Sequence, residues 1–165
     1  MRHDLHGLPP LVVPARYTLR PLAPGDVDAW AELLAANGEL GTWNHARAAP
    51  YFSPSTSVVL AHSYFVMHGE TPVATAQLEL HPHDAYTPTA ELGWVAVTPE
   101  QRGHGLGYLV CLAVLHGALA MGQRGVFLRT DDHRTPAIAT YLRLGFEPWL
   151  RDPTAAARWA AVLRA

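Results

Sequence analysis

The stretch of residues 91–108 constrains this chain more than any other part of its sequence. Residues 92–97 form a short apolar run that predicts a strand, and an apolar stripe over 106–121 predicts a helix. Between them, glycines stand at every second position from 103 to 107. A glycine-rich turn between a strand and a helix directs backbone N–H groups toward an anion, with the positive end of the helix dipole behind them. The stretch therefore predicts a site for a phosphate or pyrophosphate group.

The spacing of these glycines separates the candidate ligands. A dinucleotide fingerprint needs Gly-x-Gly-x-x-Gly, whereas this chain has Gly103-x-Gly105-x-Gly107. A P-loop needs Gly-Lys-Ser/Thr, and the chain contains no lysine. The residues do match Arg/Gln-x-x-Gly-x-Gly/Ala, through Arg102, Gly105 and Gly107. This pattern resembles the loop that binds the pyrophosphate of acetyl-CoA in the GNAT superfamily of N-acetyltransferases.

A second motif lies downstream, where Ala137, Tyr141, Gly145 and Phe146 are spaced as Ala-x-x-x-Tyr-x-x-x-Gly-Phe. This spacing resembles the other signature of the same superfamily, and it follows a strand, a helix and a further strand, as it does there. The resemblance implies an α+β fold with a central, twisted, mixed sheet of six to seven strands flanked by helices.

The length of 165 residues suits one domain with one hydrophobic core. We expect a loose arm over 1–15, the family-like fold over 16–150, and an additional C-terminal helix over 151–165. The family commonly has a strand where this helix stands. A homodimer is compatible with the resemblance, but we do not expect one built on that strand.

Hydrophobic periodicity, glycines and prolines place the individual elements. Strands are expected at residues 17–22, 58–67, 72–80, 89–97, 125–130 and 146–150. Helices are expected at residues 26–37, 44–49, 106–121, 136–144 and 154–163, the last with Asp152 as its N-cap. The runs 58–67 and 72–80 should pair as a hairpin, and 89–97 and 125–130 should run parallel because a helix joins them.

Composition limits the classes of partner. A hydrophobic content of 49% with a charged content of 16% indicates a globular protein, and the net charge of −2 argues against nucleic acid as a main partner. No apolar run reaches the roughly 20 residues of a membrane span, and polar residues interrupt the N-terminal region where a signal peptide would be apolar. The single Cys111, in the apolar stripe after the glycine loop, fits a core residue in a reducing cytosol. Because all 12 basic residues are arginine and Ala and Pro are abundant, we expect a GC-rich bacterial source.

The resemblance implies how acetyl-CoA binds. Backbone N–H groups of the glycine loop would hold the pyrophosphate, and residues 94–97 would pair with the pantetheine amides as a false strand where this strand splays from the next. At the position of Arg134 the family often has an asparagine, which helps to hold the pantetheine arm of the cofactor. The cofactor-binding residues expected on this basis are Trp94, Val95, Ala96, Val97, Arg102, Gly103, His104, Gly105, Leu106, Gly107, Tyr108 and Arg134.

Two residues are candidates for proton transfer. Tyr141 is expected to be the general acid, since a phenol is protonated at neutral pH and can donate to a departing thiolate. Glu91 is expected to be the general base, with a pKa raised by burial, and Glu79 on the neighbouring strand is the second choice. The backbone N–H of Val95 or Ala96 would stabilise the oxyanion. The alternatives are a core tyrosine, a salt-bridged Glu91, and a proton relay through water.

The acceptor site is less defined by the sequence. Trp30, Trp43, Tyr51 and Phe52 form either ordinary packing or, with Glu79, the wall of a substrate pocket, and the sequence leaves both open. Aromatic residues in a near-neutral chain favour a small amine over a basic protein tail as acceptor. We interpret His81-Pro82-His83-Asp84 as a solvated loop rather than a metal site, and expect no metal.

The leading hypothesis is a cytoplasmic enzyme that transfers an acetyl group from acetyl-CoA to a primary amine by direct attack in a ternary complex. An acyl-CoA sensor or interaction module on the same fold, without turnover, is the alternative from another functional class. A nicotinamide oxidoreductase is disfavoured by the glycine spacing.

Overall fold

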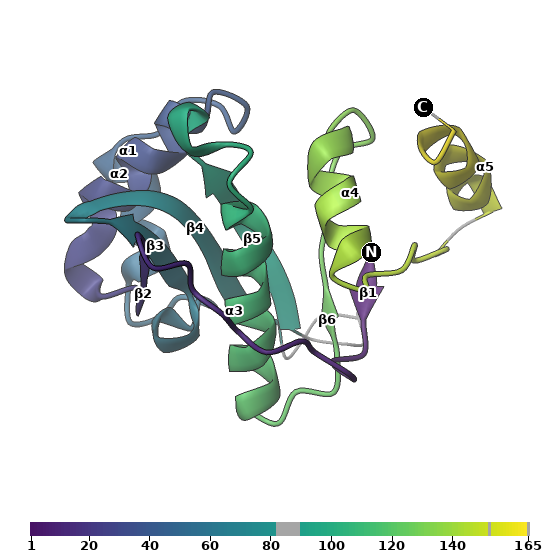
Figure 1. The fold of residues 1–165 in the computed structure, drawn as a ribbon, viewed down its shortest axis with the longest axis horizontal. Helices are drawn as coiled ribbons and strands as arrows, with labels where there is room; N and C mark the ends of the chain where they lie inside the picture. The colour runs from purple at the N-terminus through teal and green to yellow at the C-terminus, as the bar shows by residue number, and fades with distance from the viewer. Residues whose placement is uncertain (82–89, 152, 165) are drawn as a thin grey trace.

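The computed structural model describes residues 1–81, 90–151 and 153–164, and its centre is a six-stranded mixed sheet (Figure 1). The sheet order is β1-β6-β5-β4-β3-β2, with β5 and β6 parallel and every other neighbouring pair antiparallel. The strands are β1 (Arg2–His3), β2 (Thr18–Pro21), β3 (Tyr64–His68), β4 (Thr71–Leu80), β5 (Ala90–Val97) and β6 (Val126–Phe127). This arrangement confirms the expected α+β fold with its mixed sheet.

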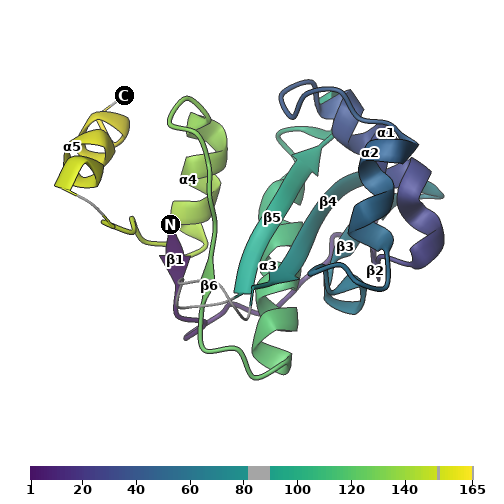
Figure 2. The ribbon, with the colours of Figure 1, turned by 180° about the vertical axis from the view of Figure 1, so that it is seen from behind.

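Helices cover both faces of the sheet (Figure 2). One face carries α1 and α2, and the other carries α3 and α4, while α5 lies beyond the β1 edge. The helices are α1 (Val27–Asn37), α2 (His45–Ala48), α3 (Leu106–Ala120), α4 (Thr135–Arg143) and α5 (Pro153–Val162). Short 3₁₀ turns stand at Pro24–Asp26, Ala49–Phe52, Leu60–His62 and Pro99–Gln101.

The core consists of a hydrophobic cluster on each face of the sheet. The larger cluster is built around α3, ten of whose fifteen residues are buried, and this explains the long apolar stripe seen in the sequence. Cys111 is fully buried in it, as expected, and burial raises the pKa of its thiol far above the ordinary value. The second cluster joins α1 and α2 to the opposite face and is rich in aromatic residues.

The expectation of a loose N-terminal arm is wrong for its first residues. Arg2–His3 pairs antiparallel with β6, and the side chains of Met1, His3 and Leu5 are buried. His3 accepts a hydrogen bond from the Leu5 N–H through Nδ1 (2.7 Å), so its Nε2 donates to the carbonyl of Leu144 (2.9 Å). The arm therefore completes the sheet at its β6 edge, which no periodicity in so short a segment could indicate.

The structure corrects two of the predicted strands on either side of the sheet, one in its start and one in its existence. The run 58–67 begins its strand only at Tyr64, because Leu60–His62 turns and the Ser63 hydroxyl accepts the Leu78 N–H that a longer strand would have paired. The run 146–150 is no strand apart from a single bridge between Glu147 and Arg2. The N-terminal β1 has taken the edge position that this last run would have needed.

The strand predicted at 125–130 is shorter than expected, at Val126–Phe127, because the chain then turns away from β5. The hairpin of β3 with β4 and the parallel pairing of β5 with β6 are both confirmed. Thr89, the expected Asp152 cap, and His83 and Asp84 of the loop lie outside the described residues.

The packing of the N-terminal arm gives a stability prediction. Gly145 ends α4 with a φ of +95°, and a Cβ there would lie 3.0 Å from Nε2 of His3. Gly122 follows α3 with a φ of +74° and open space around the same position. We expect Gly122→Ala to lower the free energy of unfolding by about 1–2 kcal/mol through backbone strain, and Gly145→Ala to lower it by about 1–3 kcal/mol more through overpacking.

Urea unfolding of the two variants measures this difference. Equal losses in both proteins would mean that His3 moves aside without cost, and would contradict a tightly held arm.

Candidate functional site

A bulge in β5 marks the centre of the site. Ala96 is paired with Thr75 of β4, but the next pair is Gly93 with Gln77, so Trp94 and Val95 together face a single residue of β4. Trp94 has a φ of +49°, a left-handed conformation that is strained for a tryptophan. A bulge leaves its extra residue out of the ladder and re-aims its backbone groups. Of the two residues expected to supply an oxyanion donor, Val95 lies within the bulge and Ala96 is paired in the ladder.

Aromatic packing holds the bulge in place. The Trp94 ring lies 4.7 Å from Trp43 and 5.4 Å from Tyr51, with centroid distances in the range of edge-to-face pairs. Trp30, Trp43 and Phe52 are buried in the cluster behind it, so these three pack the core rather than line a pocket. Tyr51 does line a cavity, as does Trp94. The structure thus divides the aromatic residues between the two alternatives that the sequence left open.

The cavity lies where β5 and β6 diverge. Among the described residues, β6 pairs with β5 only at Ala90 and Glu91, so the rest of β5 has no partner strand on that side (Figure 2). The cavity has a volume of about 360 Å³. It brings together expected site residues from five different elements or loops, namely Tyr51, Glu79, Glu91, Trp94, Val95, Arg134 and Tyr141.

Two carboxylates face each other across the β4–β5 ladder, because Glu79 and Glu91 are register partners. Glu91 is 6% exposed and accepts two hydrogen bonds from the Arg129 guanidinium, at 2.9 and 2.8 Å. His81 Nε2 lies 3.0 Å from Glu91 Oε2 without the alignment of a hydrogen bond. Glu91 is therefore committed to a forked ion pair.

Glu79 lies in a different environment from Glu91. Burial raises the pKa of Glu79 above the ordinary carboxyl value, and the nearby Glu91 charge raises it further. The Ser57 hydroxyl donates to it at 3.3 Å. A Cβ at Gly93 would stand 2.8 Å from Glu79 Oε1, so the glycine leaves the space that this carboxylate occupies. Glu79 thus combines a raised pKa with a place in the lining of the cavity, two properties that suit a general base.

Tyr141 projects from α4 into the same cavity. It is 7% exposed, and burial raises the pKa of its phenol well above the ordinary value. The hydroxyl therefore stays protonated at neutral pH and can act as a hydrogen-bond donor inside the cavity.

The glycine loop adopts the conformation that its sequence predicted. Gly103 and Gly105 have φ values of +79° and +75°, and no heavy atom lies within 4 Å of a Cβ built at either. Gly105 is the N-cap of α3, and its carbonyl accepts the hydrogen bond from the Leu109 N–H. The N–H groups of the first helical turn, residues 106–108, have no intrahelical partner and point outward at the positive end of the helix.

Two arginines reach from opposite sides to the segment after α1. Arg102 Nη2 donates to the main-chain carbonyl of Asn37 at 2.6 Å, and Arg134 Nη2 donates to that of Glu39 at 3.0 Å. Arg134 also contacts Asp131 at 3.1 Å. Residues 37–39 thus connect the glycine loop to the start of α4, and of the two arginines Arg134 lines the cavity.

The remaining expected residues lie near the loop but outside the cavity. The Val97 carbonyl accepts from the Asn37 side chain at 3.2 Å, and Ala96 is buried within the ladder. His104 is exposed beside the carbonyl of Gln101. The Tyr108 ring faces Arg143 of α4, 5.9 Å from its guanidinium, instead of the cavity.

Sequence reasoning missed Arg129 and His81 as neighbours of the two carboxylates. Arg129 stands in the run 125–130 that was expected to lie beside 89–97, but the register that pairs Phe127 with Glu91, and so brings Arg129 to it, comes from the structure. Nothing in the sequence indicated His81, whose position follows from the end of β4.

Across 1–81, 90–151 and 153–164, no group of three or more His, Cys, Asp or Glu side chains is placed to hold a metal ion. Within the same ranges, no helix combines the length and apolar character needed to cross a membrane.

Comparison with known protein families gives one match over most of the chain. The Acetyltransferase (GNAT) family matches residues 28–146. A mycothiol acetyltransferase of Nocardia farcinica is 36% identical over 162 residues, which cover 93% of this chain and 52% of the relative. A mycothiol acetyltransferase of Pseudarthrobacter chlorophenolicus is 31% identical over 156 residues, covering 88% and 47%. The chain thus spans about half the length of these curated relatives.

Solved structures share the fold. A Trypanosoma brucei acetyltransferase superimposes with a TM-score of 0.62 at 22% identity, over 82% of this chain and 96% of that one. An aminoglycoside N-acetyltransferase, solved in complex with CoA, gives a TM-score of 0.66 at 18% identity, over 82% and 92%.

Proposed function

The chain belongs to the GNAT family of acetyltransferases, and on that premise we propose that it transfers an acetyl group from acetyl-CoA to a primary amine by direct attack in a ternary complex. One observation carries the proposal: a protonated phenol, Tyr141, and a carboxylate of raised pKa, Glu79, line one cavity beside a strained strand bulge. Amide formation from a thioester needs an acid, a base and an oxyanion donor together.

The residues present fit acetyl-CoA. The N–H groups of residues 106–108 and the open, positive-φ turn at Gly103 and Gly105 suit a pyrophosphate, which helix N-termini bind readily. The edge of β5 beyond Glu91, unpaired toward β6, offers main-chain groups to the pantetheine amides. Arg102 and Arg134 can contact the phosphates and the pantetheine arm. To do so, they release the main-chain carbonyls of Asn37 and Glu39 to which they now donate.

Each catalytic step is assigned to a group of this chain. Glu79 accepts a proton from the acceptor ammonium, directly or through water, so that the amine nitrogen attacks the thioester carbonyl carbon. The Val95 N–H donates to the oxyanion that forms. When the C–S bond of this intermediate breaks, Tyr141 donates its proton to the departing thiolate, and the second proton lost by the nitrogen restores the Tyr141 hydroxyl through water, giving the N-acetyl product and CoA while Glu79 releases its proton to solvent. The Arg129 fork holds Glu91 in place beside Glu79.

A cavity of about 360 Å³ suits a small amine. Because the curated relatives are named mycothiol acetyltransferases, the amine precursor of mycothiol is the first acceptor to test. The one cysteine, reduced and buried, is consistent with a cytoplasmic enzyme.

Release of free thiol from acetyl-CoA in the presence of a panel of small amines tests the proposal. Amine-dependent release supports an acetyltransferase. Binding of acetyl-CoA by calorimetry, without release for any amine, would instead favour the alternative of a silent acyl-CoA sensor.

The glycine loop gives a prediction for cofactor binding. Gly105→Val places a branched side chain at a φ of +75°, where the pyrophosphate must approach. We expect the affinity for acetyl-CoA, measured by calorimetry, to fall at least about tenfold, equivalent to 1.4 kcal/mol. Gly69→Val is the matched control, since it has a φ of +61° in the β3–β4 hairpin with the same open surroundings. Affinity like that of the wild type in a folded Gly105→Val protein would contradict the assignment of the loop.

A further inference from the structure

The proton that Glu79 accepts in each turnover has to return to solvent before the next amine reacts. The Glu79 side chain is only 13% exposed, and it lines the same cavity that the substrates occupy. A route that leaves this cavity free therefore runs through a neighbouring side chain. The neighbours of Glu79 differ in whether they can carry a proton.

Most of these neighbours cannot pass a proton on. The Ser57 hydroxyl donates to Glu79 at 3.3 Å. The Tyr51 phenol, whose pKa is raised by burial and by the Glu79 charge, keeps its own proton at neutral pH. Arg129 is a guanidinium, which does not lose its proton in proteins, and it holds Glu91 in the forked ion pair. None of these four groups is suited to relay a proton near neutral pH.

Among the described residues, His81 is the remaining titratable neighbour of Glu79. Its Nε2 lies 4.0 Å from Glu79 Oε2 and 3.0 Å from Glu91 Oε2, and this nitrogen is buried without an aligned hydrogen-bond partner. The His81 side chain as a whole is 24% exposed, against 13% for Glu79 and 8% for Glu91. One edge of the ring thus faces the two carboxylates, while the side chain reaches solvent more than either of them.

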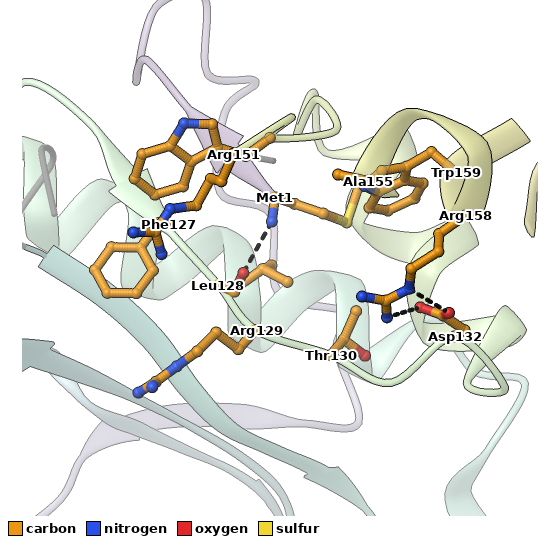
Figure 3. A pocket seen from close by; sticks show the side chains of 11 residues that line it. Met1, Phe127, Leu128, Arg129, Thr130, Asp132, Arg151, Ala155, Arg158 and Trp159 are labelled. Atoms are coloured by element: carbon orange, nitrogen blue, oxygen red, sulfur yellow. Dashed lines mark hydrogen bonds and ion pairs between the residues drawn. The ribbon is translucent and has the colours of Figure 1, made fainter. Parts of the chain in front are cut away.

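Packing against β6 holds the His81 ring in this position. The ring lies 6.1 Å from that of Phe127, and Phe127 is the register partner of Glu91. Figure 3 shows Phe127 and Arg129 extending to the same side of their segment. One of them contacts His81 and the other contacts Glu91. The histidine that follows β4 is therefore fixed beside both carboxylates by the same segment.

We propose that His81 carries the proton from Glu79 to solvent during acetyl transfer. The inference rests on the proposed function and deepens it, because it assigns the route by which the base is regenerated. Imidazole is the side chain that ordinarily changes its charge between about pH 5 and 8, and its two nitrogens let a proton enter on one side and leave on the other. His81 does not touch the substrates and acts through Glu79, so it is a positioning residue.

The route balances in protons and charge. The neutral ring, with its hydrogen on Nδ1, accepts the proton of the Glu79 carboxylic acid at Nε2, which leaves a carboxylate and an imidazolium. The imidazolium gives its Nδ1 proton to water or buffer, and exchange with solvent then returns the remaining hydrogen from Nε2 to Nδ1. The distance of 4.0 Å requires a small rotation of one side chain or one bridging water, since such contacts commonly tighten only when substrate is bound.

Replacing His81 with glutamine tests the route. Glutamine keeps a polar side chain of similar size but does not exchange protons near neutral pH. For the most active amine of the panel, in dilute buffer, we expect kcat to fall about ten- to hundredfold, toward the range of acid–base groups. The affinity for acetyl-CoA should stay that of the wild type. The solvent isotope effect on kcat should rise, because release of the proton becomes the slow step.

Added imidazole separates a relay from a structural role. Imidazole is not a primary amine, and it can take the proton from Glu79 in place of the missing ring. We expect kcat of His81→Gln to rise with imidazole concentration toward that of the wild type, whose own kcat should hardly change. Glu79→Gln should stay slow, because it lacks the carboxylate that takes the proton first.

His45→Gln is the matched control. His45 also contacts a carboxylate, that of Asp28 at 2.7 Å, but it belongs to α2 and does not line the cavity. Its loss should leave kcat and the isotope effect unchanged. Melting temperature identifies a folded His81→Gln protein, and His81→Asn supplies a smaller replacement if the glutamine lowers it.

The outcomes distinguish this inference from the proposed function. A folded His81→Gln protein with the kcat of the wild type in dilute buffer would mean that Glu79 returns its proton directly to solvent, while acetyl transfer stands. A slow His81→Gln protein that imidazole does not rescue would make His81 a structural support only. If the wild type releases no thiol with any amine, acetyl transfer and the relay are both wrong.

Discussion

Replacing Tyr141 with phenylalanine is expected to lower kcat by about 10²- to 10⁴-fold, the usual contribution of general acid catalysis. The change removes one hydroxyl and little volume from a side chain that is 7% exposed. Its ring contact with Phe146, at 6.0 Å, should persist. Affinity for acetyl-CoA should therefore stay near that of the wild type, and calorimetry together with steady-state kinetics separates the two effects.

Tyr64→Phe is the matched control for this substitution. Tyr64 is a half-buried phenol on β3 whose pKa is also raised by burial, but it does not line the cavity. Its loss of one hydroxyl should leave kcat unchanged. If Tyr141→Phe also turns over like the wild type, Tyr141 is a packing residue and water protonates the thiolate.

Glu79→Gln is expected to lower kcat/KM by about 10²- to 10⁴-fold near neutral pH, because it removes the proposed base. In the wild type, kcat/KM should rise with pH as Glu79 loses its proton, since only the carboxylate accepts one. Burial and the Glu91 charge raise the pKa of Glu79, so this rise should occur above the pH at which an ordinary glutamate ionises. The variant should lack that rise and partly recover at high pH, where the amine is already neutral.

Glu91→Gln tells the two carboxylates apart. It breaks the fork to Arg129 and removes a negative charge beside Glu79. The acid limb of the profile should persist but move to lower pH, because one of the causes that raise the pKa of Glu79 is gone. If instead Glu91→Gln abolishes the limb and Glu79→Gln keeps it, Glu91 is the base and Glu79 only shapes the cavity.

Local sequence determined the parts of the protein that depend on neighbours along the chain. The turn at Gly103 and Gly105 needs φ values that glycine adopts at low cost, and the fifteen-residue α3 follows from a continuous apolar stripe. The motif with Ala137, Tyr141 and Gly145 at four-residue spacing places the phenol of Tyr141 on one face of α4 and a glycine just after the end of the helix. These features are encoded within a few residues, so the motifs sufficed to predict the fold and the candidate acid.

Contacts between distant segments were decided only by the tertiary structure. The pairing of Arg2–His3 with β6 joins residues more than 120 positions apart, and it occupies the edge of the sheet where a strand was expected at residues 146–150. Arg129 and His81 meet Glu91 only because the sheet brings three separate segments together.

The division of roles between the two carboxylates has the same origin. Glu79 and Glu91 are the same residue type on neighbouring strands, and nothing in their sequence context ranks them. Their difference lies in which partner the fold supplies: Arg129 neutralises Glu91, while burial beside Gly93 leaves Glu79 with a raised pKa. Sequence alone determined which residue types and turns could form an acetyl-transfer site. Only the fold decided which carboxylate is left to accept a proton, because burial and charge pairing depend on residues far apart in the chain.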